Sequence, residues 1–404
     1  MFDLHLRSLR SFRLLCCLAA VPACTDDADA DADATPDCTE LAPTCAETQQ
    51  VCVESQQGAT CEFCPDGEFL GTSNECEAIE GEPLSHAFES FDVAAGEEIK
   101  DLCQSWTLDN PEELWVSAVE MRQDYASHHS IWTFVPDDEF DGEDGVWWCD
   151  ARNYSIVAAA VAGGNLYNQS TQAEHETQRF ANDAAIRIPP YSRVIGEIHL
   201  LNTTGEPLSG NMNLTLYTRT RDEVSTPLTP VEMTFDEVFV PAMSESRMVT
   251  ECDLSDAFAE VGEPVDFTVY HVMPHSHERG RRLFIEVVGG PMDGTKILDD
   301  VHYATFEPRG YNFQEPLEIT GATGLRYGCE FENTDPWDYV WGFKEEMCQF
   351  SMFVDSPLAW TMAIDELEDV GEEDGMLTHR GRNCRVVTAL WNHDKPGGPG
   401  PDGQ

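Results

Sequence analysis

The chain has 404 residues, and its 75 acidic residues against 23 Lys and Arg give a formal net charge of −52. A surface of that sign repels phosphate backbones and anionic headgroups, which argues against nucleic acid as a partner. Such a surface would attract cations, although solubility alone also accounts for the charge. The length allows two or three domains, and 41% hydrophobic residues are enough to fill their cores.

The N-terminal segment predicts export. Three arginines precede an apolar run over residues 14–23, which is too short to span a bilayer as a permanent helix. The sequence "VPAC" resembles a bacterial lipobox, so residues 1–23 are interpreted as a signal peptide and Cys24 as a lipidated N-terminus. Ordinary cleavage near Ala23 is the alternative. We therefore expect a bacterial protein outside the cytoplasm, either secreted or held in the cell envelope by this anchor alone.

The cysteine count supports export. Of 15 cysteines, Cys16 and Cys17 leave with the signal peptide and Cys24 is taken by lipid, and 15 − 2 − 1 leaves 12. An even number is typical of a disulfide framework in an oxidising compartment.

Two short regions follow the signal peptide. Residues 24–37 are acidic and repetitive, which predicts a solvated tether. Residues 38–82 contain six cysteines and few large hydrophobic residues, which predicts a small module with three disulfides. Cys61 and Cys64 have a spacing that also serves zinc or redox chemistry, but the crowding of four further cysteines favours structural pairing. The six are Cys38, Cys45, Cys52, Cys61, Cys64 and Cys76.

From about residue 83 the chain consists of short apolar runs, rich in β-branched and aromatic residues and interrupted by Gly, Pro, Asn and Asp. Runs of this length and composition predict strands, and long helical periodicity is lacking. We expect an all-β fold of two tandem antiparallel β-sandwiches, jelly-roll-like, over residues 83–232 and 233–392. The tail, residues 393–404, is rich in Gly and Pro and is expected to be disordered.

Histidines gather in a few short stretches. In "HVMPHSHERG", residues 271–280, His275 and His277 have the spacing at which strand residues face one side, and His271 shares that parity. His128 and His129 are adjacent in "YASHHSIW". Adjacent strand residues face opposite ways, so this pair can share a metal only at a bulge or a strand end.

Two further candidates are His199 in "VIGEIHLLN" and Met347 in "FKEEMCQF". Each of them alone is most simply a residue of the core. Together the candidates suggest metal binding, since three imidazoles suit copper, zinc, iron or nickel, and two imidazoles with a thioether favour copper. The imidazoles must be neutral to bind, so metal affinity is expected to fall below about pH 6.5.

From about residue 85 to 390, the order of these motifs resembles the copper type II, ascorbate-dependent monooxygenases. This is the family of dopamine β-hydroxylase and peptidylglycine α-hydroxylating monooxygenase. The segment "VHYATFEPRGYNFQ" is similar to one in the dopamine β-hydroxylase branch. The resemblance implies two β-sandwiches with one copper each, two coppers per chain. It implies that His128, His129 and His199 hold one copper and that His275, His277 and Met347 hold the catalytic one.

The resemblance also implies the reaction and the disulfides. One atom of O2 would enter a C–H bond of a small organic substrate, and a one-electron reductant such as ascorbate would supply two electrons. The family's pattern implies the pairs Cys329–Cys348 and Cys252–Cys384, which leaves Cys103 and Cys149 as a third pair.

Two positions depart from the peptide-amidating branch. Met273 stands where that branch has an arginine for the substrate carboxylate, and Ser351 stands where it has a tyrosine. A glycine-extended peptide is therefore not the expected substrate, and the substrate stays open. Two other classes also stay open: a copper-binding surface lipoprotein without turnover, and an adhesion protein whose cysteine-rich module binds a partner.

Overall fold

The computed structural model describes residues 37–56, 58–124, 127–304, 307, 309–342 and 346–390. The expected signal peptide, Cys24, nearly all of the tether and the tail lie outside these residues. The described α-helices are short, and none of them is long and apolar enough to cross a bilayer. They are α1 (Cys38–Glu47), α2 (Ile156–Ala162) and α3 (Ser255–Val261).

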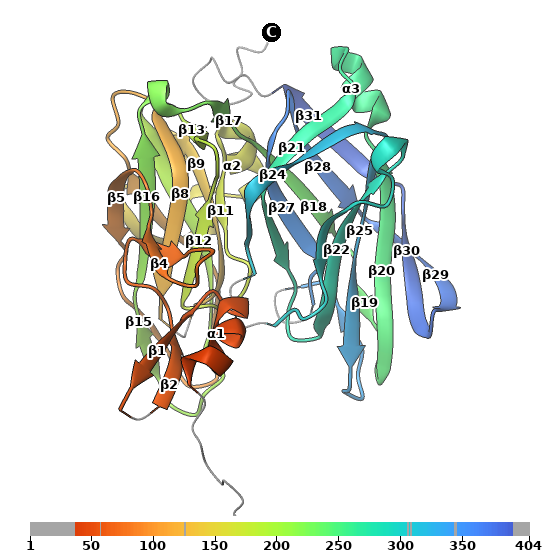
Figure 1. The fold of residues 1–404 in the computed structure, drawn as a ribbon, viewed down its shortest axis with the longest axis horizontal. Helices are drawn as coiled ribbons and strands as arrows, with labels where there is room; N and C mark the ends of the chain where they lie inside the picture. Colours follow the sequence, from red (N-terminus) through yellow and green to blue (C-terminus); the bar gives the residue numbers. More distant parts are fainter. Residues whose placement is uncertain are drawn as a thin grey trace, which may run out of the picture.

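The cysteine-rich segment folds as a small disulfide module. It consists of α1, β1 (Val51–Ser55), β2 (Gly58–Glu62), β3 (Glu68–Leu70) and β4 (Cys76–Ala78). Its disulfides are Cys38–Cys52, Cys45–Cys61 and Cys64–Cys76. The CxxC cysteines thus belong to different disulfides. The module lies against the first sandwich, with α1 on the side toward the second (Figure 1).

The first sandwich is built from two sheets. One has the strand order β10-β7-β14-β9-β11, and the other has the order β17-β13-β8-β16-β5 with β12 also paired to β8. Apolar residues of both sheets, among them Trp132, Val194 and Met121, form its core. The strands are β5 (Glu82–Ala87), β7 (Glu98–Thr107), β8 (Leu114–Gln123), β9 (Ser127–Pro136), β10 (Gly145–Trp148), β11 (Gly164–Asn168), β12 (His175–Arg179), β13 (Ala184–Ile188), β14 (Ser192–Leu201), β16 (Met212–Arg219) and β17 (Thr226–Pro227).

The second sandwich has two six-stranded sheets, of orders β24-β21-β27-β18-β28-β31 and β23-β22-β25-β20-β30-β29. Its first strand, β18, spans the position between 232 and 233 at which the sequence pattern divided the sandwiches, so this sandwich begins at Thr229. The strands are β18 (Thr229–Phe235), β20 (Ser244–Asp253), β21 (Val265–His275), β22 (Gly280–Val288), β23 (Lys296–Asp300), β24 (Tyr311–Ala322), β25 (Gly324–Asn333), β27 (Gln349–Asp355), β28 (Leu358–Ile364), β29 (Glu366–Glu373), β30 (Met376–Arg382) and β31 (Arg385–Leu390).

The predicted fold class is confirmed: the protein is all-β, with two tandem and largely antiparallel β-sandwiches after a disulfide module. Among the described strands, the parallel pairs are β13 with β17, β18 with β28, and β20 with β30. The sandwiches contain Cys252–Cys384 and Cys329–Cys348, which the family resemblance implied, and Cys103–Cys149, the pair that was left over.

The two sandwiches stand side by side and pack closely (Figure 1). Tyr270 and Phe353 of the second sandwich are part of the apolar core of the first. A carboxylate also crosses the interface, because Glu232 of β18 accepts hydrogen bonds from the side-chain amides of Asn165 and Asn168. The packing therefore fixes side chains of one sandwich against those of the other.

Candidate metal centre

Three of the candidate histidines meet on two neighbouring strands of the first sandwich. His129 on β9 is opposite His199 on β14, but the next residue, Leu200, is opposite Ser127. His128 is therefore the extra residue of a β-bulge, which is the condition under which two adjacent histidines share a side. The ring centroids of His128 and His129 lie 5.0 Å apart, and they lie 4.7 and 4.9 Å from that of His199.

The second sandwich contributes two histidines from one strand end. His275 is the last residue of β21, and His277 lies in the turn that leads to β22, with 5.2 Å between the ring centroids. The pair is thus brought together by the end of a strand and not by strand alternation. His271 stays outside the group, because its Nδ1 is 2.9 Å from Asn312 Oδ1 and its ring packs near Phe353.

All five histidines form one buried cluster between the sandwiches. The ring centroid of His129 lies 4.9 Å from that of His275, and the centroid of His128 lies 5.2 Å from that of His277. Ligand nitrogens of His128, His129 and His277 lie within 4.8 Å of one another. The two sets of imidazoles that the family resemblance assigns to separate coppers therefore lie in contact, because the packing of the sandwiches places them side by side.

Hydrogen bonds set the orientation of two rings in the cluster. The Nδ1–H of His275 donates to the carbonyl of Ser170 at 2.9 Å, which leaves its Nε2 with a lone pair. The Nε2–H of His199 donates to Glu98 Oε1 at 2.8 Å, which directs Nδ1 to a point 3.1 Å from His129 Nε2. Carbonyl and carboxylate partners of this kind orient histidines toward metal ions.

Burial keeps these imidazoles neutral. Desolvation is the main cause that lowers the pKa of His128 and His129 well below 6.5, and neighbouring histidines add to the effect. Desolvation also lowers the pKa of His275, and it brings that of His199 to about 3. The neutral form is the one that binds a metal.

The donor set fits a bound metal ion. Within the described part of the chain, His128 Nδ1 and His275 Nε2 are buried nitrogens with no hydrogen-bond partner. A buried polar atom without a partner costs free energy, and a metal ion supplies one partner for several lone pairs at once. Neutral imidazoles in this number suit copper, zinc, iron or nickel.

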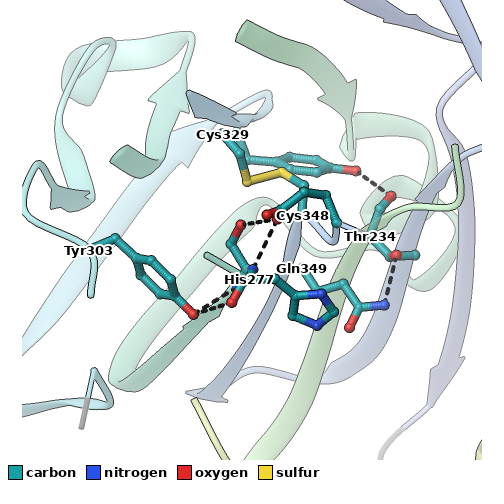
Figure 2. Close-up of a disulfide and its surroundings, with 9 residues drawn as sticks. Thr234, His277, Tyr303, Cys329, Cys348 and Gln349 are labelled. Atoms are coloured by element: carbon teal, nitrogen blue, oxygen red, sulfur yellow. Dashed lines mark hydrogen bonds between the residues drawn. A yellow bond between two sulfur atoms is a disulfide. The ribbon is translucent and has the colours of Figure 1, made fainter. Parts of the chain in front are cut away.

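Met347 is buried, with 2% of its surface exposed, and the residue before it contacts the turn that carries His277. The carboxylate of the preceding residue, Glu346, accepts from the backbone N–H of His277 at 3.0 Å and from Ser276 Oγ at 3.1 Å. The following residue, Cys348, is bonded to Cys329, and Figure 2 shows this disulfide with His277 close by. The methionine segment is thereby fixed from both sides.

The residues that support the cluster were not predicted from the sequence. Tyr303, drawn in Figure 2, accepts from the backbone N–H of Ser276 at 2.9 Å and donates to the carbonyl of the same residue at 2.5 Å. Its hydroxyl also lies 3.2 Å from the carbonyl of Ser170. Tyr303 and Glu346 do lie within the quoted segments "VHYATFEPRGYNFQ" and "FKEEMCQF", so the sequence could have pointed to them. Glu98 and Ser170 lie in no motif, and only the tertiary structure identifies them.

Comparisons with known proteins give no family for this chain. No protein-family model and no curated protein matches it. The major capsid protein P2 of bacteriophage PM2 matches with a TM-score of 0.27 and 9% identity, over 68% of this chain and 98% of that one. The VP2 subviral particle of infectious bursal disease virus has a TM-score of 0.19 and 9% identity, over 85% and 82% of the two chains. Likenesses this weak carry no argument about function.

Proposed function

We propose that the protein is a copper-dependent monooxygenase, which hydroxylates a C–H bond of a small organic substrate with O2 and a reductant such as ascorbate. The observation that carries the proposal is the buried cluster of five histidines, contributed by both sandwiches next to the Met347 segment. The order of the motifs supports the same class. The substrate gains one oxygen atom as a hydroxyl, and the other atom leaves as water with two electrons and two protons.

Two sets of residues would hold the metal. His128, His129 and His199 would hold one copper, and His275, His277 and Met347 would hold the other. Copper bound there would supply oxygen activation and electron transfer, and a thioether ligand favours Cu(I). The chain's own contribution is to fix the imidazoles in the neutral form and to exclude water around them.

Two coppers per chain are expected by elemental analysis of the loaded and dialysed protein. The change His128→Ala should lower this value to about one, because it removes a ligand from one set only. The buried His379 lies on β30, outside the cluster, so His379→Ala is the matched control and should keep both coppers. If the unchanged protein reproducibly holds one copper and His128→Ala also holds one, His128, His129 and His199 are not a copper site.

Copper retention should persist to a lower pH than the ordinary histidine pKa of 6.5 suggests. Burial lowers the pKa of His128, His129, His199 and His275, so protons compete for these nitrogens only in more acidic solution. Dialysis of the loaded protein at a series of pH values between about 4 and about 8 measures the pH at which half of the copper is lost. A midpoint at or above the ordinary pKa would contradict the burial argument.

A second candidate function is copper binding without turnover. The burial of all five histidines favours it, because a substrate needs a path to the metal. An oxygen electrode distinguishes the two functions when copper-loaded protein is given ascorbate and a panel of amines and phenols. Retained copper without ascorbate-dependent O2 uptake would favour storage. Loss of copper on dialysis would leave only an adhesion or interaction protein.

A further inference from the structure

A cavity of about 510 Å³ lies where the disulfide module meets both sandwiches. The module contributes Phe63 and Phe69 to its wall, β12 contributes Arg179, and the second sandwich contributes Arg309 and Asn312. Cavities of several hundred Å³ at the junction of domains are typical sites for small molecules. None of the five clustered histidines lines this cavity, and neither does Met347.

Direct contacts fix the walls of the cavity. The module is held to the first sandwich by Arg122, which donates to the carbonyl of Cys64 at 2.7 Å and pairs with Asp66 at 2.8 Å. It is held to the second sandwich by Gln49, which donates to the carbonyl of Gly310 at 3.1 Å. These contacts hold the walls of the cavity in place.

Arg179 is the distinctive side chain of this cavity. Its guanidinium carbon lies 3.7 Å from the centroid of the Phe69 ring, so the planar group stacks on the aromatic face. Across the residues that the structure describes, this guanidinium has no ion pair and no hydrogen bond. Stacking occupies its face and leaves the N–H groups at its edge available to an acceptor.

Arg309 and Asp299 are matched within the protein, and the exposed Glu47 also lines the cavity. Arg309 pairs with Glu307, and its Nη1 lies 3.9 Å from Asp300. Asp299 accepts from Arg282 at 2.6 Å. Arg179 is thus the cation of this cavity that has no close partner among the described residues.

Partial burial makes this unpaired cation costly. Desolvation lowers the pKa of Arg179, and the more distant charge of Glu77 opposes that effect only in part. A bound anion would offset the desolvation cost, because it gives the guanidinium a partner with matching geometry. The chain has 75 acidic residues for only 23 Lys and Arg, which is enough to pair nearly every cation internally. Arg179 is nevertheless left without an ion pair among the described residues.

We propose that the cavity binds a small aromatic carboxylate, with its carboxylate on the edge of Arg179 and its ring beside Phe63. The planar guanidinium fork matches the two oxygens of a carboxylate. The partly buried Phe63 offers an apolar surface, and its ring already meets that of His175 at 5.4 Å in an edge contact. This inference does not depend on copper or on turnover.

Calorimetric titration of the full chain without copper tests the proposal. The probe is phenylacetate, and phenylacetamide is the neutral molecule of the same shape. We expect one phenylacetate per chain, and at least about tenfold weaker binding of the amide, because it lacks the charge. The titration is repeated with copper-loaded protein. The comparison distinguishes a failure of this site from a failure of the proposed copper function.

Variants locate the site. Arg179→Gln should weaken phenylacetate binding by at least about tenfold, a loss of about 1.4 kcal/mol. Arg380→Gln, which changes an exposed arginine paired with Glu373, is the control and should leave the affinity unchanged. Equal binding of acid and amide to the unchanged protein, equal binding to the Arg179 variant, or no binding at millimolar phenylacetate would each overturn the proposal.

Discussion

Replacing Met347 with isoleucine is expected to lower ascorbate-dependent O2 consumption by at least about 100-fold. Loss of residues that only orient metal ligands costs roughly 10–100-fold, and a direct ligand should cost at least as much. Isoleucine has a similar volume, so the buried position should tolerate it at a cost of about 1.5 kcal/mol or less. The measurement is an oxygen electrode with copper-loaded protein, ascorbate and a substrate found in the panel described above.

A matched control separates ligand loss from damage to the core. Met362 is fully buried in the same sandwich and belongs to its apolar core, so Met362→Ile makes the same chemical change there. We expect Met362→Ile to keep full activity and both coppers. Met347→Ile should keep the fold and about one copper per chain, held by the first set of histidines. Full turnover by Met347→Ile would show that Met347 is not a ligand of the catalytic copper.

Replacing Glu232 with glutamine is expected to stabilise the protein at alkaline pH by up to about 5 kcal/mol. Glu232 is partly buried between the sandwiches, and desolvation raises its pKa from 4.5 to about 8, although Asn165 and Asn168 donate hydrogen bonds to it. Neither of these two hydrogen-bond partners is a cation, so they do not neutralise the ionised form of Glu232. Glutamine stays neutral at every pH, and its amide brings N–H donors close to two buried asparagine oxygens.

The sign of this effect follows from proton binding. Between pH 4.5 and about 8 the unfolded chain has released the Glu232 proton while the folded protein retains it, so folding stability falls as the pH rises through this window. The stabilisation by Glu232→Gln should therefore be small at pH 4.5 and complete above about pH 8. Urea unfolding at several pH values measures it, with Glu263→Gln at an exposed position as the control. A difference that does not change with pH would show that Glu232 is ionised in the folded protein.

The local geometry of the histidines could be predicted from the sequence, but their final arrangement could not. The requirement for a bulge at His128 and His129 follows from strand alternation alone, and β9 has that bulge. Strand alternation also predicts which side His199 faces within its sheet. It does not predict which surface of one sandwich packs against the other, because that depends on contacts such as those of Tyr270 and Phe353.

The supporting polar residues show the same limit. Ser170 accepts from His275 through a backbone carbonyl, which every residue type has, so no side-chain pattern can reveal it. Glu98 is one of 75 acidic residues, and nothing in its neighbourhood distinguishes it until β7 is placed beside β14. The two disulfides of the second sandwich, in contrast, followed from the family resemblance, and Cys103–Cys149 was the pair that remained.

The Cys252–Cys384 disulfide links β20 to the residue just before β31, across 132 positions of the chain. A protease that cut the exposed turn at Asp374 would therefore release nothing, since the two fragments would remain covalently joined. Electrophoresis without a thiol would show such a nicked protein at its full mass. Only reduction would separate the C-terminal fragment. Proteolytic damage at this turn would therefore be seen only on a gel run under reducing conditions.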